Sequence, residues 1–191
     1  MDPMLDLSQA WSTFPVLETE RVLLRALTQA DAPEHFRIWS HPAVMAGHSA
    51  AVLPDLGQSE EFIQRYAQSF ARHEAIRWAV TRRDDGRLLG TCGFHTVSLQ
   101  HHRAEIGYEL HPDHWGQGFM SEAVWAMLGH GFLDMNLHRV EANVDPDNAA
   151  SASLLRRLGF TDEGYLRERF YDNGRFTHDW FFSMLAHEYS E

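Results

Sequence analysis

Apolar residues recur along the chain with two different periods. Spacing of three and four residues, typical of one helix face, predicts helices over about 28–39, 59–72, 119–134 and 149–157. Runs rich in branched and apolar residues predict strands over 19–27, 76–81, 88–97, 103–110 and 139–144. From Phe160 onward the pattern predicts two further strands around Asn173-Gly174. This order of elements predicts a mixed sheet of the α/β (α+β) class in a single domain.

Local signals mark where several of these elements begin and end. Thr28, with Asp31 three residues later, predicts a capped helix start, and Ser59 is predicted to cap the next helix. Asp85-Gly86 predicts a hairpin turn between two strands. Gly159 is predicted to end the last helix, because glycine readily adopts the left-handed conformation found there.

Length and composition suit one domain over residues 1–191, with 1–15 a loosely held lead-in and 40–56 largely a polar loop. The contents of 44% hydrophobic and 23% charged residues are ordinary for a globular protein. The longest apolar runs are too short for a membrane span, and the N-terminus lacks the pattern of a signal peptide. The single cysteine, Cys92, is expected to be a core residue and suits the cytoplasm, where we expect the protein.

The charge pattern narrows the classes of partner. A formal net charge of −11 argues against nucleic-acid binding, which requires a basic surface, and is compatible with a cationic amine or basic peptide. Thirteen histidines raise the question of a metal, and His111 and His114 form a His-x-x-His pair. No cysteine pair or His-Glu-x-x-His motif accompanies them in the sequence, so we predict no metal site.

A glycine loop lies between the strand at 103–110 and the helix that follows. Gly116 and Gly118 let the backbone adopt positive φ and approach a ligand closely. The unpaired N–H groups and the dipole of the following helix favour a phosphate at this point. The loop has no Gly-Lys-Ser/Thr sequence of a P-loop and lacks the third glycine of a dinucleotide fingerprint. By itself it is therefore equally compatible with an ordinary strand-to-helix turn.

Four segments, in order, resemble a known family. They are Glu18-Thr-Glu-Arg-Val-Leu-Leu-Arg-Ala-Leu27, Ala104-Glu-Ile-Gly-Tyr-Glu-Leu110, Trp115-Gly-Gln-Gly-Phe-Met-Ser-Glu-Ala123, and Asp147-Asn-Ala-Ala-Ser-Ala-Ser-Leu-Leu-Arg-Arg-Leu-Gly-Phe160. The chain is similar over about 18–186 to the GNAT-superfamily N-acetyltransferases, specifically the RimJ/RimL type. The resemblance implies a single-domain GNAT fold, with a central, mostly antiparallel sheet that splays at the cofactor cleft and is flanked by helices.

The same resemblance implies the co-substrate and its binding residues. Acetyl-CoA would lie between the splayed strands, without a metal, and its pyrophosphate would meet the backbone of the glycine loop. Asn148 would bind the pantetheine or phosphate region, although its residue type and position also predict a helix N-cap. The cofactor-binding residues so implied are Leu110, Trp115, Gly116, Gln117, Gly118, Phe119, Met120, Asn148 and Ser151.

The reaction implied is direct attack of a primary amine on the acetyl thioester. We predict Glu105 as the base, acting through water, with Glu109 on the same strand face and His95 and Glu168 as reserves. Glu105 could equally be a solvated strand residue. Ser151 matches the position implicated in handling the thiolate, but could also be an ordinary first-turn residue.

Two departures from the family pattern stand out. Leu155 occupies the place of the tyrosine that many GNAT enzymes use as general acid, so that role cannot be carried over. Met120 is bulkier than the Gly or Ala usual at the sixth loop position, and Trp115 replaces the usual Arg or Gln at the first. Met120 would either narrow the loop or point into the core.

The acceptor substrate is also indicated by the resemblance alone. The resemblance favours a protein N-terminal α-amine, with ribosomal proteins as the precedent. The alternatives are a small amine, such as a polyamine or antibiotic, and a non-catalytic acetyl-CoA-binding sensor or interaction domain. Family precedent also allows a homodimer, while neither a nucleic acid nor a membrane is expected as a partner.

Overall fold

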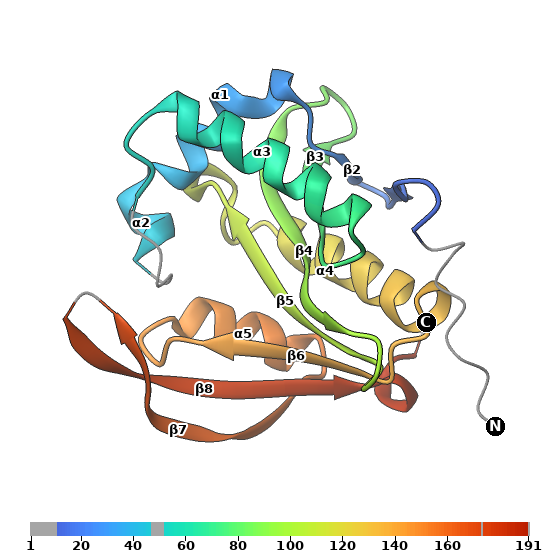
Figure 1. Cartoon of the computed structure of the whole chain (residues 1–191), viewed down its shortest axis with the longest axis vertical. Helices are drawn as coiled ribbons and strands as arrows, with labels where there is room; N and C mark the ends of the chain where they lie inside the picture. Colours follow the sequence, from blue (N-terminus) through green and yellow to red (C-terminus); the bar gives the residue numbers. More distant parts are fainter. Residues whose placement is uncertain (1–10, 47–51, 173, 191) are drawn as a thin grey trace.

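The computed structural model describes residues 11–46, 52–172 and 174–190. Within these residues the strands form one eight-stranded sheet in the order β1-β2-β3-β4-β5-β6-β8-β7 (Figure 1). Neighbouring strands are antiparallel except β5 and β6, which run parallel. The predicted mixed sheet is therefore confirmed.

The first part of the chain forms one edge of the sheet and the helices on one face. The elements are β1 (Leu17–Glu18), β2 (Val22–Ala26), a 3-10 turn (Gln29–Asp31), α1 (Ala32–Trp39), α2 (Pro42–Met45) and α3 (Leu56–Ala71). Thr28 begins the 3-10 turn, and its backbone N–H donates to Asp31 Oδ2 at 2.8 Å, which confirms the predicted capping pair.

Two predictions in this region are wrong. The predicted loop after Ser40 contains the short helix α2, which His41 caps by accepting from the N–H of Ala43. Residues 47–51 of that loop lie outside the described residues. Ser59 does not cap α3, because the helix begins earlier, with Asp55 as its cap. The Ser59 hydroxyl is buried instead and contacts His35 and the carbonyl of Ala32.

A three-strand meander forms the middle of the sheet. It consists of β3 (Ile76–Arg82), β4 (Leu88–Ser98) and β5 (Arg103–Leu110). Gly86 has φ of +69° in the turn between β3 and β4, as the Asp-Gly pair predicts. The β4–β5 register shifts between His95 and Ser98, and Thr96 lies at this irregularity with φ of +51°.

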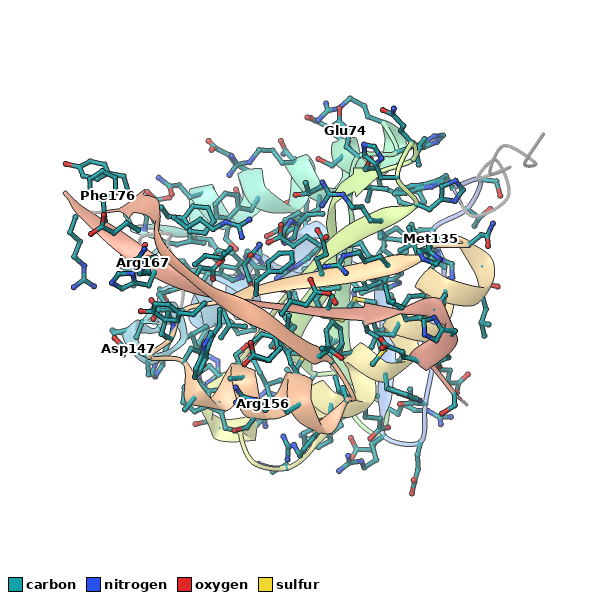
Figure 2. The ribbon with its side chains drawn as sticks, turned by 90° about the horizontal axis from the view of Figure 1, so that it is seen from below. Glu74, Met135, Asp147, Arg156, Arg167 and Phe176 are labelled. Atoms are coloured by element: carbon teal, nitrogen blue, oxygen red, sulfur yellow. The ribbon has the colours of Figure 1, made fainter. Side chains whose placement is uncertain are left out.

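The rest of the chain completes the other half. A 3-10 turn (Pro112–His114) leads to α4 (Phe119–Gly129), a π-helical turn (His130–Asp134), β6 (Arg139–Val144), α5 (Ala149–Arg157), β7 (Thr161–Asp172), β8 (Arg175–Leu185) and a last 3-10 turn (Ala186–Glu188). Gly159 follows α5 with φ of +89°, as predicted. The long β7–β8 hairpin extends from the sheet, with the exposed Phe176 near its tip (Figure 2).

Strand alternation sorts the side chains of the meander onto two faces. Trp78, Cys92 and Ile106 belong to the main core, which also contains the apolar residues of α4 and α5. Ala79, on the opposite face, packs with Ile38 of α1 in a second, smaller core. The molecule therefore has an α4/α5 face and an α1/α3 face, named here for the helices that cover them.

The parallel ladder between β5 and β6 is short. It pairs Arg103 with Arg139, Ala104 with Val140 and Glu105 with Glu141. In the described parts of these strands no later pair is formed, although β5 runs on to Leu110 and β6 to Val144. The two strands thus part in the middle of the sheet, and this gap connects its two faces.

Residues 11–15 of the expected lead-in are held by packing. Trp11 is 5% exposed, and the centroid of its ring lies 5.3 Å from that of Phe70. The ring of Phe14 contacts those of Phe70 and Trp78. Residues 1–10 lie outside the described residues. Among the helices of the described ranges, none is both long and apolar enough to cross a membrane.

Candidate active site

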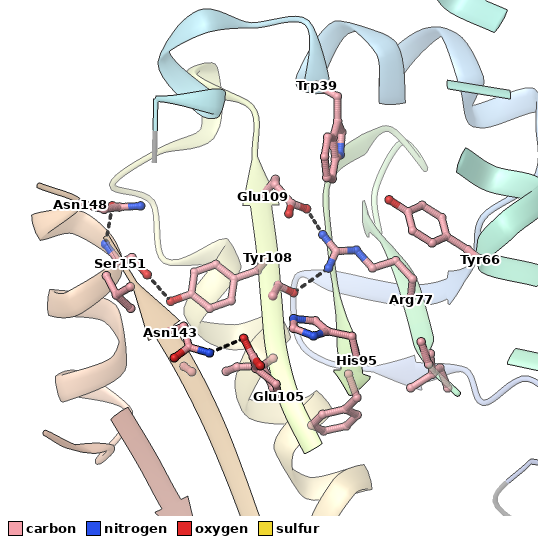
Figure 3. A pocket seen from close by; sticks show the side chains of 17 residues that line it. Trp39, Tyr66, Arg77, His95, Glu105, Tyr108, Glu109, Asn143, Asn148 and Ser151 are labelled. Carbon is pink, nitrogen blue, oxygen red and sulfur yellow. Dashed lines mark hydrogen bonds and ion pairs between the residues drawn. The ribbon is translucent and has the colours of Figure 1, made fainter. Parts of the chain in front are cut away.

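A cavity of about 350 Å³ opens where β5 and β6 part. Strands β3, β4 and β5 form one wall, and β6 with the first turn of α5 forms the other. Trp39 of α1 and Tyr66 of α3 lie over it on the α1/α3 face (Figure 3). Of the predicted site residues, Glu105, Asn148 and Ser151 line this cavity, whereas Leu110 and the glycine loop do not.

Glu105 lies on the α1/α3 side of the gap. Its Oε1 accepts a hydrogen bond of 2.6 Å from Asn143 Nδ2 on β6, so the bond spans the parting strands (Figure 3). His95 is its register partner on β4. Burial lowers the pKa of His95, and the nearby Glu105 charge opposes this shift. Near neutral pH, the carboxylate of Glu105 therefore has a neutral imidazole and a neutral amide beside it.

Glu109 has a different environment, although alternation places it on the same face. It is buried, accepts from the Thr91 hydroxyl at 2.8 Å, and forms an ion pair with Arg77. Arg77 also donates to the carbonyl of Gly107 at 2.9 Å. The fixed cation neutralises the Glu109 carboxylate and engages it, so this group is poorly placed to accept a substrate proton.

Tyr108 and Ser151 meet on the α4/α5 side of the gap. Tyr108 packs against the main core, and its hydroxyl lies 2.8 Å from Ser151 Oγ (Figure 3). Asn148 caps α5 by accepting from the N–H of Ser151 at 3.0 Å, and also lines the cavity, so a cap and a ligand contact are compatible. Leu155 is fully buried in the core, away from the cavity lining.

The glycine loop has the backbone conformation that the sequence predicts. Gly116 and Gly118 have φ of +72° and +83°, and Gly118 is the N-cap of α4. Because glycine has no side chain, it provides no cap for the amides of the first turn. A Cβ added at Gly116 would meet no described atom within 4 Å. Open space beside uncapped N–H groups is what a pyrophosphate requires, so these residues fit the phosphate end of acetyl-CoA.

The other loop side chains have mainly structural contacts. Met120 and Phe119 are buried, so Met120 points into the core and does not narrow the loop. The Trp115 indole N–H donates to the carbonyl of Leu110 at 2.7 Å. Arg21 of the β1–β2 turn donates to the carbonyl of Gln117 at 2.8 Å and pairs with Glu122 of α4 at 2.7 Å. Arg21 therefore braces the loop from a distant part of the sequence.

Several residues of the site were not found by sequence reasoning. Each of them forms a hydrogen bond with a residue at least 30 positions away in sequence. They are Asn143, Tyr108, Arg77 and Arg21. Alternation from Ile106 could have placed Tyr108 on the core face of β5. The reserve candidate Glu168 lies on β7 and is not part of the cavity lining. The ring centroids of His111 and His114 are 6.2 Å apart, and no metal-binding cluster is found in the described residues.

The gap through the sheet holds the cavity, which is lined by side chains from both faces. Residues 21–161 match the family described as the acetyltransferase (GNAT) domain. The chain therefore belongs to the GNAT acetyltransferases and is an N-acetyltransferase, in a family that uses acetyl-CoA. This favours an enzyme over the non-catalytic alternative.

Relatives and solved structures agree with this assignment. The N-acetyltransferase YoaA of Bacillus subtilis, itself uncharacterized, is 41% identical over 161 residues, covering 84% of this chain and 91% of the relative. The spermidine N(1)-acetyltransferase of Escherichia coli K12 is 29% identical over 55% of this chain and 56% of its own.

Among solved structures, a GNAT-family acetyltransferase from Bacillus anthracis has a TM-score of 0.83 and 24% identity, over 91% of this chain and 100% of the other. The ribosomal-protein-S5-alanine acetyltransferase of Vibrio fischeri has a TM-score of 0.75 and 22% identity, over 93% and 100%. At these identities the two structures support the fold alone.

Proposed function

We propose that this acetyltransferase, acting as one domain over residues 1–191, transfers the acetyl group of acetyl-CoA to the N-terminal α-amine of a protein, as the RimJ/RimL type does. The observation that carries the proposal is the charge of the acceptor side of the cavity. Among the described lining residues, Glu105 is the carboxylate with no ion-pair partner, since Arg77 engages Glu109. A single carboxylate without a cation partner suits an acceptor with one ammonium group.

A polyamine makes a different demand. It carries several ammonium groups, and each one that leaves water requires a partner. The relationship to spermidine N(1)-acetyltransferase and the net charge of −11 keep a small polyamine as the second candidate. The RimJ/RimL resemblance of the sequence motifs makes a protein N-terminal amine the first candidate.

In the proposed reaction the two substrates approach from opposite faces of the sheet. The amine enters from the α1/α3 face and gives up a proton to Glu105 through water. Its nitrogen then attacks the carbonyl carbon of the thioester, which lies in the gap. The carbon–sulfur bond breaks with its electron pair on sulfur, on the α4/α5 face beside Ser151, and the nitrogen releases its second proton to solvent. The glycine loop and Asn148 hold acetyl-CoA, and position is itself a large part of catalysis in such direct transfers.

The test is a thiol-release assay with acetyl-CoA and a panel of acceptors. The panel holds peptides that begin with Ser, Ala or Thr, together with spermidine and an aminoglycoside. We expect turnover on peptides, with kcat lowered at least about 100-fold in Glu105→Gln because a positioned base is lost. Glu18→Gln, on the exposed β1 edge, is the matched control. Turnover on spermidine alone would replace the first candidate with the second, and an unchanged Glu105→Gln rate would end the role of Glu105.

A further inference from the structure

Tyr108 reaches across the gap from one wall to the other. It projects from β5, and its hydroxyl lies 2.8 Å from Ser151 Oγ in the first turn of α5, 43 positions later (Figure 3). Both residues line the cavity. A contact between the two walls, at the gap where the thioester is proposed to lie, places a phenol next to the hydroxyl assigned to the leaving sulfur.

Each of the two hydroxyl groups carries one hydrogen atom. The direction of the hydrogen bond between them decides where the serine hydrogen can point. Burial raises the pKa of Tyr108 to about 12, so the phenol stays protonated at physiological pH. Each hydroxyl can donate once and can also accept. If Tyr108 donates to Ser151 Oγ, the serine hydrogen is free to point elsewhere. If Ser151 donates to Tyr108, the serine has no hydrogen left for the sulfur.

The position of Ser151 is fixed independently of this bond. Its N–H is held by Asn148 Oδ1 at 3.0 Å, which anchors the first turn of α5 at the cavity. The hydroxyl can still rotate about χ1 and about its own C–O bond. A donor on one side of the oxygen restricts that rotation and directs the serine hydrogen into the gap. Leu155, at the position of the usual family acid, is fully buried and cannot supply a donor.

We propose that Tyr108 is a positioning residue for acetyl transfer, which donates to Ser151 and thereby aims the serine hydroxyl at the departing sulfur. The inference rests on the proposed role of Ser151. The carbon–nitrogen bond forms as the carbon–sulfur bond breaks, and the sulfur keeps the electron pair and accepts the serine hydrogen bond. Glu105 takes the first ammonium proton before the attack, and the nitrogen releases its second proton to solvent as the amide forms. The thiolate takes its final proton from solvent. Tyr108 keeps its own proton throughout.

The experiment compares wild type, Tyr108→Phe, Ser151→Ala and the double variant, using whichever amine the wild-type enzyme acetylates. Phenylalanine keeps the ring in the core and removes the hydroxyl alone. We expect Tyr108→Phe to lower kcat about tenfold, with KM for acetyl-CoA changed less than about twofold. In the Ser151→Ala background the same substitution should have no further effect, because its partner is absent. Tyr171→Phe, on the exposed β7–β8 hairpin, is the matched control.

The outcomes separate this inference from the proposed function. The acceptor panel decides the substrate class, whereas the ratios among the four enzymes decide the role of Tyr108 on any acceptor. An unchanged kcat in Tyr108→Phe, or equal losses in both backgrounds, overturns the positioning role. An unchanged kcat in Ser151→Ala overturns it as well, because Tyr108 is proposed to act only by orienting the serine hydroxyl. If no amine is acetylated, acetyl-CoA hydrolysis without acceptor supplies the rate for the same four-enzyme comparison.

Discussion

Replacing Arg21 by methionine should weaken CoA binding although Arg21 lies outside the cavity lining. The substitution keeps much of the aliphatic stem and removes the guanidinium. That group donates to the carbonyl of Gln117 at 2.8 Å, pairs with Glu122 at 2.7 Å, and lies 4.9 Å from the centre of the Phe119 ring. All three partners belong to the glycine loop or the start of α4, so the loss falls on the proposed pyrophosphate site.

The size of the effect follows from the exposure of each contact. The Arg21 side chain is 44% exposed, so the ion pair contributes well under about 1 kcal/mol. The hydrogen bond to the loop carbonyl contributes about 1 kcal/mol, and the contact with the Phe119 ring about 0.5 kcal/mol. Together these contacts contribute about 2 kcal/mol. If their loss acts entirely by disordering the glycine loop, the Kd for CoA rises about 30-fold, and this value is an upper bound.

Isothermal titration with CoA measures this directly, without reference to turnover. Arg72→Met, which removes an exposed ion pair with Glu74 after α3, is the matched control. Thermal unfolding would show that the Arg21→Met protein is folded. A Kd for CoA within twofold of wild type in the folded variant would refute the reasoning that this arginine preorganises the loop.

Two further predictions concern buried positions. Burial raises the pKa of Asp179 to about 6, and Glu105 and Asp145 add to the shift. A raised carboxyl pKa means that the charged form destabilises the folded state as pH rises from about 4 through 6. Asp179→Asn should therefore gain about 1–2 kcal/mol in free energy of unfolding relative to wild type between pH 5 and pH 8, by denaturant titration. A constant difference between the two proteins would contradict this assignment. Leu155→Tyr should lose about 1–3 kcal/mol through overpacking without raising kcat. A faster enzyme would show that position 155 reaches the active site after all.

The fold could largely be predicted because its signals are local. The β3–β4 hairpin, the glycine loop and the end of α5 each depend on a few neighbouring residues whose backbone preferences are strong. Helix α2 was missed because four residues are too few to show a helical period. The cap of α3 was misplaced because Asp55 and Ser59 are both good capping residues. The choice depends on His35 and Ala32, which bind the Ser59 hydroxyl from another helix.

The motifs of the site could be predicted from the sequence, but the side-chain contacts between its residues could not. Family motifs supplied Glu105, Asn148 and Ser151, and the structure places all three on one cavity. Nothing local in the sequence could show that Arg77 pairs with Glu109 and that, among the described residues, Glu105 has no cation partner. Strand alternation places both glutamates on the same face and so does not distinguish them. Likewise, the bond between Tyr108 and Ser151 exists only because two distant segments face each other across the gap.

The short ladder between β5 and β6 also determines where main-chain hydrogen-bonding groups are available in this protein. Beyond Glu105 and Glu141, each strand turns toward the other a row of main-chain donors and acceptors that this ladder does not use. A strand edge without a neighbouring strand usually lies at the rim of a sheet, where it can recruit foreign strands and cause aggregation. Here it lies in the interior, next to a cavity of about 350 Å³. A slender molecule with amide groups along its length can pair there, but a folded neighbour cannot enter, so the protein keeps a usable edge shielded from aggregation.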